Sequence, residues 1–576
     1  MLGTDVRACW GYRHEMQLTK HHQVISAAEG ARLEVSMQQS PTGFTWSVSN
    51  ESDFSVEVRS ISAVYLLTQV EGELAMFRHG YQSWSQSNVA KPGEDVDPST
   101  VSSVEMVTMT QHADQRRTRD AQLRSEMVTV ISDSHESVLI GFLGGHLHDG
   151  TIRVDQVGTD FEVAIEAFLG SAELAPHETR TLHEVVIRSV GDPAGGLDSW
   201  ASQIGECSNA RTEAEFQVGW CSWYHYFDQV TESDLLKNLE LAADWPFDVV
   251  QLDDGFQSEI GDWLVTNEKF PSGLKGIADS ISSAGFRPGL WIAPFGVSLN
   301  SRLAHDHPDW IAKDFSGEPL IGMFGPHWGG FVHTLDVTNP EVLEHLESLA
   351  RELVRLGFTY LKLDFTYSPG FDGIWADRSL TPAQRVRAGY DAIRRGAGED
   401  TFILGCGAPL GACIGVVDGM RIGSDVAPFW APKPELWPYV GYEQTIPSTK
   451  NAWRNTLTRA HQHRSLWLND PDCVMLRTSD TELTAEQVRA WALAVGASGG
   501  MVLVSDDLAL LDEESRLLLR EVIELGQRSD AASRSGPAPV CTDLMQEFTP
   551  RHLEFAGLRL VGDPELGSAR IEAADR

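Results

Sequence analysis

Residues 340–365, PEVLEHLESLARELVRLGFTYLKLDF, contain the unit from which the fold is built. The first part, residues 340–357, starts on a proline and is expected to form a helix. The second part, residues 360–365, is a short apolar strand interrupted by one lysine and one aspartate. Each of these charged groups is costly to bury alone, so their place in an inner strand requires an explanation.

The same alternation of short apolar strands and helical stretches begins at about residue 215. It predicts a parallel sheet with crossover helices. Eight strand–helix units over about 300 residues fit a (β/α)8 TIM barrel, with a doubly wound open sheet as the structural alternative. The candidate strands are residues 217–223, 248–254, 287–295, 360–365, 401–407, 419–425, 465–471 and 499–506.

The barrel pattern occupies only part of a chain of 576 residues, which is too long for one ordinary core. Residues from about 20 to 195 alternate apolar and polar side chains between Gly, Pro, Ser and Asn, as in an all-β sandwich. The last 45 or so residues are again rich in strand formers. We therefore predict an N-terminal β-sandwich domain over residues 1–200, a central barrel over 215–528 and a small C-terminal β domain over 529–576.

The composition restricts the class of partner. The net charge of −37 argues against nucleic acid or an anionic membrane surface as partner, and no apolar run approaches the roughly 18 residues that span a membrane. The N-terminus lacks the pattern of a signal peptide, which predicts a cytoplasmic location. The seven cysteines include no CxxC pair, as expected for free thiols in a reducing compartment.

Carboxylates stand at the ends of several predicted strands, where a barrel builds its active site. Alternation along strand 360–365 puts Lys362 and Asp364 on one face, and Leu361, Leu363 and Phe365 on the other. We expect the apolar set to pack on the helices and the polar pair to point into the upper barrel. The other strand-end carboxylates are Asp253, Asp254, Asp425 and Asp470, and Arg421 is in phase with Asp425.

These carboxylates have two interpretations. An inward Lys–Asp pair can be a structural ion pair, and an aspartate at a strand end can cap the next helix. For Asp336, which sits just before a Pro-started helix, we expect a structural role that only organises that turn. Four strands that end in carboxylates, with tryptophans nearby, favour a functional site. His461 and His463 are interpreted as ordinary helix residues because positions i and i+2 do not face each other, so no metal site is predicted. The pattern favours metal-free glycoside hydrolysis, in which one carboxylate attacks and the other protonates the leaving oxygen.

Eight motifs along the chain carry a further signal. They are HGYQSWS (79–85), GWCSWYHYF (219–227), LDDGFQ (252–257), LWIAPF (290–295), LKLDF (361–365), CGAPLG (406–411), DGMRIGSDVAPFW (418–430) and NDPDC (469–473). In this order they resemble glycoside hydrolase family 36, and the likeness is greatest to its shorter bacterial α-galactosidases. The resemblance covers the sandwich, the barrel and the tail, and it implies the three-domain architecture described above.

The resemblance implies a role for each matched residue. Asp364 corresponds to the nucleophile that forms a covalent glycosyl-enzyme, and Asp425 corresponds to the general acid/base. The remaining matches are substrate-binding residues: Asp253 and Asp254 for the hydroxyls at C4 and C6, Lys362 and Arg421 as sugar-binding cations, Trp291 as a pocket wall, Trp84 over the barrel mouth, and Cys406 and Gly407 near the C2 hydroxyl. Lys362 is expected to favour the ionised form of Asp364.

The resemblance implies a retaining exo-α-galactosidase that needs no cofactor and acts on α-galactoside oligosaccharides or glycosides. α-N-Acetylgalactosaminidase, another α-glycosidase and a transglycosylase on the same scaffold are the enzymatic alternatives. A non-catalytic sugar-binding protein would be expected to lack a catalytic carboxylate, and both are present at Asp364 and Asp425. Family members often assemble into oligomers, so a homo-oligomer is one expected state.

Overall fold

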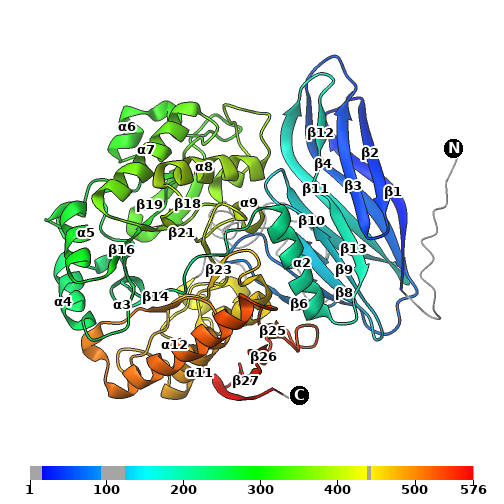
Figure 1. The fold of residues 1–576 in the computed structure, drawn as a ribbon. Helices are drawn as coiled ribbons and strands as arrows, with labels where there is room; N and C mark the ends of the chain where they lie inside the picture. The colour runs from blue at the N-terminus through cyan, green and yellow to red at the C-terminus, as the bar shows by residue number, and fades with distance from the viewer. Residues whose placement is uncertain (1–15, 93–122, 438–442, 575–576) are drawn as a thin grey trace.

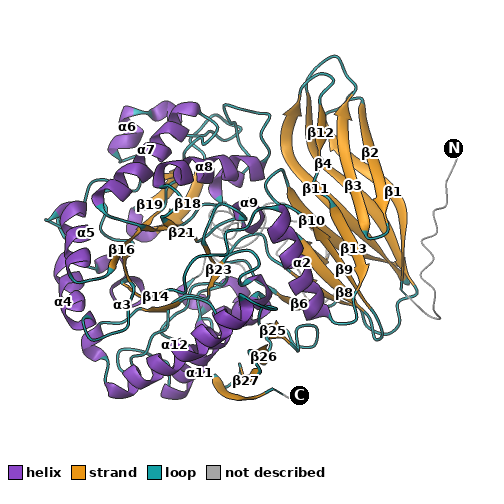
Figure 2. Ribbon diagram, in the orientation of Figure 1, coloured by secondary structure: helices purple, strands orange, loops and turns teal. Residues whose placement is uncertain are grey.

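The computed structural model describes residues 16–92, 123–437 and 443–574, so Cys9 lies outside the described residues. A barrel of strands surrounded by helices stands beside a separate β-sandwich, and the C-terminal strands lie below the barrel (Figures 1 and 2). Helix α2, Pro193–Cys207, runs between the sandwich and the barrel. The predicted multidomain architecture is confirmed, while the residue limits of the three domains remain our proposal.

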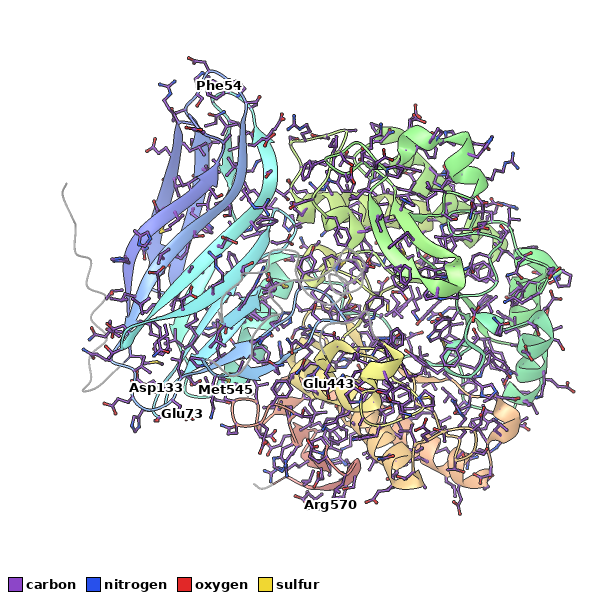
Figure 3. The ribbon with its side chains drawn as sticks, turned by 180° about the vertical axis from the view of Figure 1, so that it is seen from behind. Phe54, Glu73, Asp133, Glu443, Met545 and Arg570 are labelled. Atoms are coloured by element: carbon purple, nitrogen blue, oxygen red, sulfur yellow. The ribbon has the colours of Figure 1, made fainter. Side chains whose placement is uncertain are left out.

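The N-terminal part consists of two antiparallel sheets. One has the order β1-β4-β11-β10-β7, and the other β12-β3-β13-β9-β8-β5-β6, with β2 paired to β3. Figure 3 shows Phe54 at one end of this sandwich and Glu73 and Asp133 at the other. The strands are β1 Gln17–Ala27, β2 Leu33–Ser40, β3 Gly43–Asn50, β4 Val56–Thr68, β5 Ala75–Arg78, β6 Asn88–Ala90, β7 Leu123–Glu126, β8 Val128–Ser132, β9 Ser137–Phe142, β10 Asp149–Val157, β11 Asp160–Leu174, β12 Thr179–Thr181 and β13 Val185–Ser189.

Eight parallel strands form the barrel, in the order β23-β22-β21-β20-β16-β15-β14-β24. The Met501 amide donates to the Asn469 carbonyl oxygen at 2.9 Å, which joins the two end strands and nearly closes the sheet. The open-sheet alternative is therefore wrong. The strands are β14 Val218–Cys221, β15 Val249–Leu252, β16 Arg287–Ile292, β20 Tyr360–Leu363, β21 Phe402–Gly405, β22 Gly419–Arg421, β23 Leu468–Asp470 and β24 Val502–Val504.

Side-chain caps set where the outer helices begin. The Thr231 hydroxyl accepts from the Asp234 amide at the start of α4, and the Asn339 side chain accepts from the Glu341 amide at the start of α7. No helix within the described ranges is long and apolar enough to cross a membrane. The helices around the barrel are α3 Trp223–Tyr226, α4 Glu232–Ala242, α5 Gly273–Ser283, α6 Arg302–Asp306, α7 Pro340–Leu356, α8 Pro382–Ala397, α9 Leu410–Cys413, α10 Thr449–Thr458, α11 Ala485–Ala497 and α12 Glu513–Ser533.

The segment between β16 and α7 carries a small antiparallel sheet that we did not predict. It contains β17 Gly296–Val297, β18 Ile321–Gly325 and β19 Gly330–Thr334. Asp336 follows this sheet and accepts from the Thr338 amide at 2.9 Å and the Ala376 amide at 2.8 Å, so it organises the turn before α7 as expected.

The chain ends in a four-stranded antiparallel sheet below the barrel. Its strands are β25 Val540–Cys541, β26 His552–Phe555, β27 Leu558–Asp563 and β28 Ser568–Ala573. Two tryptophans of the barrel region hold it. The Trp430 indole donates to the Pro564 carbonyl at 2.7 Å, and the Trp453 indole donates to the Pro550 carbonyl at 2.8 Å. The sheet therefore packs on α10 and on the loop after β22.

The loop that follows β5 connects the sandwich to the mouth of the barrel. The Ser83 amide donates to the Ala408 carbonyl at 3.1 Å. Arg459 is fully buried, and its Nη1 donates to the carbonyls of Ser83 at 2.6 Å and Ile422 at 2.9 Å, while its Nη2 donates to Gln82. This guanidinium therefore ties the loop to the strand end that leads to Asp425.

Replacement of Arg459 by methionine is expected to destabilise the protein by about 3 kcal/mol, because three buried carbonyls lose a charged donor. The unfolding free energy from urea titration measures this loss. The matched control is Arg489→Met, which removes a half-exposed ion pair with Glu521 and should cost less than about 1 kcal/mol. Equal losses in the two variants would contradict the tethering role.

A cluster of buried histidines lies at the same junction. The rings of His79 and His461 are 6.5 Å apart. His461 belongs to a 3-10 helix, Ala460–Gln462, and His463 follows it as a buried partner of Asp530, so the prediction that both are ordinary helix residues is wrong. Burial lowers the pKa of His461 to about 3 and that of His79 well below its usual value.

These depressed pKa values predict acid sensitivity. A histidine in the unfolded chain titrates near 6.5, so below that pH the unfolded state binds more protons than the folded state. Stability present above about pH 6.5 is therefore expected to be lost as pH falls toward about 3, by about 1.4 kcal/mol per pH unit for His461. Urea unfolding at pH 7 and pH 5 should show a shallower dependence for His461→Asn. An unchanged dependence would contradict this assignment.

Candidate active site

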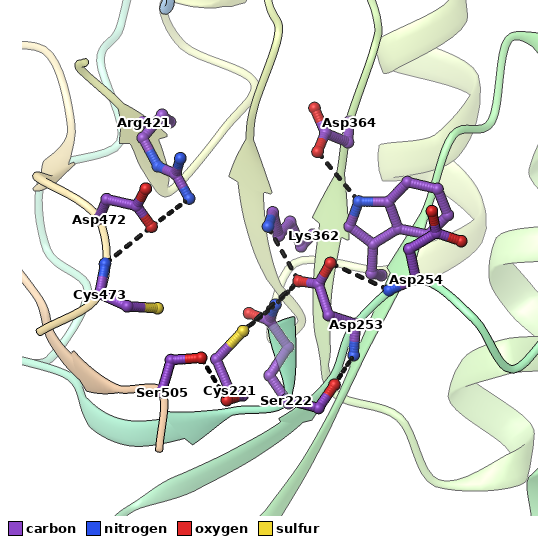
Figure 4. Close-up of polar contacts among 12 residues, drawn as sticks. Cys221, Ser222, Asp253, Asp254, Lys362, Asp364, Arg421, Asp472, Cys473 and Ser505 are labelled. Atoms are coloured by element: carbon purple, nitrogen blue, oxygen red, sulfur yellow. Dashed lines mark hydrogen bonds and ion pairs between the residues drawn. The ribbon is translucent and has the colours of Figure 1, made fainter. Parts of the chain in front are cut away.

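Asp364 lies immediately after β20 at the barrel mouth (Figure 4). Its amide donates to the Ile292 carbonyl of the neighbouring strand at 2.9 Å. The Trp291 indole donates to Asp364 Oδ2 at 3.0 Å, and the Phe365 amide donates to Oδ1 at 2.8 Å. The carboxylate is thus held in one orientation by two neutral donors.

Burial raises the pKa of Asp364, and the charges of Asp425 and Asp253 act in the same direction. Lys362 and the Trp291 hydrogen bond lower this pKa, but they do not offset burial. Lys362 thus favours the ionised form of Asp364, as expected, although burial outweighs this effect. Its ammonium group forms its ion pair with Asp253, at 2.9 Å from Oδ2. Lys362 does share the inward face with Asp364, as the alternation predicted.

Asp253 is the centre of a polar network below this pair (Figure 4). Its Oδ2 also accepts from Gln251 Nε2 at 2.5 Å and from the Cys221 thiol at 3.5 Å, and its amide donates to the Ser222 hydroxyl at 2.9 Å. Burial lowers the pKa of Lys362, but the charge of Asp253 and of other nearby groups raises it by more than burial lowers it. The net pKa lies well above the usual value for lysine. Lys362 therefore stays charged and fixes Asp253 in the site.

Asp254 contacts residues that we did not predict. His327 Nε2 lies 3.0 Å from Asp254 Oδ2, and the Trp328 indole donates to the same oxygen at 2.9 Å. Both belong to the 3-10 helix Pro326–Trp328, between β18 and β19. Gln257 Nε2 donates to Oδ1 at 2.6 Å. The aromatic-rich HWGG stretch in a long segment between a strand and a helix was the only sequence signal for the two missed residues.

Phe365 does not pack on the helices as predicted. β20 ends at Leu363, and Phe365 has a φ of +53°, so the alternation of a strand does not extend to it. Its ring lies 5.0 Å from the ring of Trp84 and 5.0 Å from that of Trp328. The structure thus brings the sandwich tryptophan Trp84 to the barrel mouth.

Cys406 and Gly407 lie behind Asp364. Burial raises the pKa of the Cys406 thiol well above its usual value, with the charge of Asp364 as the next cause, so the group stays neutral. Gly407 has a φ of +49°, and a Cβ there would lie 2.9 Å from the ring of Trp84 and 3.1 Å from Asp364 Oδ1. Only glycine fits this close approach.

Arg421 joins three carboxylates on the other side of the mouth. Nη1 lies 2.9 Å from Asp425 Oδ1, Nε lies 3.2 Å from Asp470, and Nη2 lies 2.8 Å from Asp472. The Asp425 side chain is 31% exposed, so it can reach a substrate, whereas Asp470 and Asp472 are buried. Strands β20 and β22 flank β21, so the two catalytic candidates come from next-nearest strands of the barrel.

The described residues contain no group of three or more His, Cys, Asp or Glu side chains placed to hold a metal ion. A mouth lined by one carboxylate pair, two buried cations and several tryptophans defines a site of the glycoside hydrolase class. Sugar rings have apolar faces for the indoles and hydroxyls for the charged groups.

Comparison with known proteins supports this class. Residues 218–369 match the family described as Melibiase. α-Galactosidase AgaA of Geobacillus stearothermophilus is 28% identical over 278 residues, which is 45% of this chain and 37% of that protein. α-Galactosidase Mel36A of Lactobacillus acidophilus is 36% identical over 151 residues, which is 25% of this chain and 20% of that protein. The matched part of the chain thus spans little more than a third of the length of AgaA and a fifth of the length of Mel36A.

Solved structures extend the likeness to nearly the whole chain. The α-galactosidase TtGalA of Thermus thermophilus, in complex with stachyose, has a TM-score of 0.68 at 26% identity and covers 87% of this chain and 99% of that one. The GH36 α-galactosidase AgaA has the same fold, with a TM-score of 0.61 at 14% identity over 95% of this chain and 79% of that one. Residues 218–369 thus resemble the Melibiase family, and the predicted resemblance to glycoside hydrolase family 36 is confirmed.

Proposed function

We propose that the protein is a retaining exo-α-galactosidase that hydrolyses terminal α-linked galactose through a covalent glycosyl-enzyme. The observation that carries the proposal is the pair Asp364 and Asp425 at one barrel mouth, each fixed by its own donor. Trp291 holds Asp364 at 3.0 Å, and Arg421 holds Asp425 at 2.9 Å. Such a pair can divide nucleophilic attack and proton transfer between two carboxylates.

In the proposed first step, Asp364 attacks the anomeric carbon while Asp425 donates a proton to the leaving oxygen. In the second step, Asp425 accepts a proton from water, and the water replaces Asp364 at the anomeric carbon. The half-exposed position of Asp425 suits exchange with leaving groups and water, while the buried position of Asp364 suits attack on an enclosed sugar. No cofactor enters these steps.

Galactose is the sugar we propose for the pocket. Asp253 and Asp254 present adjacent carboxylates at the end of β15, and Asp254 is oriented by Trp328 at 2.9 Å. Paired carboxylates can accept from two neighbouring hydroxyls, which agrees with the roles at C4 and C6 that the family implies. The bound stachyose of TtGalA supports an α-galactoside oligosaccharide as substrate.

An α-N-acetylgalactosaminidase is the second candidate, because one relative with 30% identity over 213 residues is named an A type blood α-D-galactosamine galactosaminidase of Flavonifractor plautii, and galactosamine also carries a nitrogen substituent at C2. The family resemblance implies that Cys406 and Gly407 lie near the C2 hydroxyl, so these two residues would decide whether a 2-acetamido group is accepted. Initial rates on 4-nitrophenyl α-galactoside and its 2-acetamido analogue decide between the two candidates. We expect turnover of the galactoside, and turnover of neither would contradict a glycosidase of either kind.

The same assay, with a second sugar added as acceptor, measures the balance between hydrolysis and transglycosylation. We propose that hydrolysis dominates. A cytoplasmic location and assembly into a homo-oligomer remain predictions from the sequence.

A further inference from the structure

Asp472 has no role in the sugar site described above, yet its geometry is unusual. Its side chain has no exposed surface, and its backbone has a φ of +92°, in the left-handed region that residues with a Cβ rarely adopt. A buried carboxylate on a strained backbone costs free energy unless its contacts compensate. Two of the contacts of Asp472 lead toward Asp425.

The first route passes through Arg421. Oδ1 of Asp472 lies 2.8 Å from Arg421 Nη2, on the opposite side of the guanidinium from the Nη1 that holds Asp425 at 2.9 Å. Asp470 also lies 3.2 Å from Arg421 Nε. Because a planar guanidinium that is held at two nitrogens has a fixed third nitrogen, Asp472 and Asp470 together set the orientation from which Arg421 meets Asp425. Figure 4 shows this Arg421–Asp472 contact and the Cys473 amide that donates to the same carboxylate.

The second route is through the backbone. Oδ2 of Asp472 accepts from the Val426 amide at 2.9 Å, and Val426 directly follows Asp425. The same oxygen accepts from the Tyr224 hydroxyl. Burial, together with the charges of Asp425 and Asp472, raises the pKa of Tyr224 well above its usual value, so its hydroxyl remains protonated and donates. Asp472 therefore fixes both the side-chain partner of Asp425 and the chain beside it.

We propose that Asp472, held by Tyr224, is the positioning residue for the acid/base Asp425. The inference rests on the proposed glycosidase function, in which Asp425 transfers the proton. The proposal predicts that replacement of Asp472 lowers kcat/KM most for substrates whose leaving group depends most on protonation by Asp425. A residue that only stabilised the barrel would affect all substrates equally.

Asp472→Asn is the sharpest variant. All four contacts of the carboxylate come from donors, two to each oxygen, so the amide nitrogen of asparagine must face two donors and breaks one of the two routes. On aryl α-galactosides of graded leaving-group acidity, we expect kcat/KM to fall by roughly 10- to 100-fold for the least acidic phenol and by less than about 3-fold for the most acidic. Tyr224→Phe should show a smaller trend in the same direction.

Asp506→Asn is the matched control. Asp506 is a buried strand-end aspartate that pairs with Arg477 at 2.6 Å and accepts the Leu476 amide at 2.6 Å, but it contacts neither Arg421 nor Val426. Any loss in this variant should be the same for every leaving group. An equal loss across the series in Asp472→Asn would overturn the positioning role.

A crystal structure of Asp472→Asn tests the same inference without a substrate. We expect the Arg421–Asp425 contact or the Val426 segment to move, and an unchanged arrangement would overturn the proposal. Turnover of any aryl α-galactoside by the unmodified protein tests the proposed function separately. Failure of one is thus distinguishable from failure of the other.

Discussion

Replacement of Asp364 by alanine is expected to lower kcat/KM for an aryl α-galactoside by more than about 10⁴-fold, because no other group can form the covalent intermediate. Asp364 is oriented by Trp291 at 3.0 Å and by the Phe365 amide at 2.8 Å, and neither donor can act as a nucleophile. Steady-state kinetics measures the loss. Asp336→Asn is the control, since this buried aspartate accepts only structural contacts and should leave the rate within about 3-fold.

Rescue of Asp364→Ala by azide distinguishes the loss of a nucleophile from misfolding of the site. The alanine variant leaves a space where Asp364 stood, and azide in that space should attack the α-galactoside and release β-galactosyl azide. Full activity of Asp364→Ala without azide would show that another group attacks the sugar.

Replacement of Asp425 by alanine is expected to have the second largest effect, with a loss that depends on the leaving group. General acid catalysis contributes about 10²- to 10⁴-fold, so kcat/KM for a poor leaving group should fall by that range. For 2,4-dinitrophenyl α-galactoside the first step needs no proton, and kcat/KM should change by less than about 10-fold. The second step then lacks its base, so kcat falls and a burst of dinitrophenol is expected.

Azide also tests this assignment, with the opposite stereochemistry. It should attack the glycosyl-enzyme of Asp425→Ala from the face that water would use and release α-galactosyl azide. The β-azide from this variant would contradict the assignment of acid/base and nucleophile. Lys362→Met serves as the control, because it removes the partner of Asp253 at 2.9 Å and should raise KM without dependence on the leaving group.

The periodicity of the sequence was sufficient to predict the barrel and the placement of some of its active-site residues. All eight predicted strands exist, and alternation placed Lys362 and Asp364 on one face because both lie on or directly after the regular strand β20. The same rule failed for Phe365, where the chain leaves the strand with a φ of +53°. Alternation describes a pleated backbone and carries no information about the residues beyond it.

The parts of the site that were missed come from segments without periodicity. His327 and Trp328 reach Asp254 from a 3-10 turn between β18 and β19, and Tyr224 reaches Asp472 from the short helix α3. The sequence also did not predict which charged side chains form ion pairs with each other. Lys362 pairs with Asp253, 109 positions away in the chain, because β20 and the end of β15 lie on either side of β16.

The most direct test of the account is to trap the covalent intermediate. The protein is incubated with an activated 2-deoxy-2,2-difluoro-α-galactoside, and the labelled peptide is identified by mass spectrometry. We predict one difluorogalactosyl group, attached to Asp364. A label on Asp425, on Asp253 or on any other residue would contradict the account, as would rapid turnover of the unmodified substrate with inversion and no label.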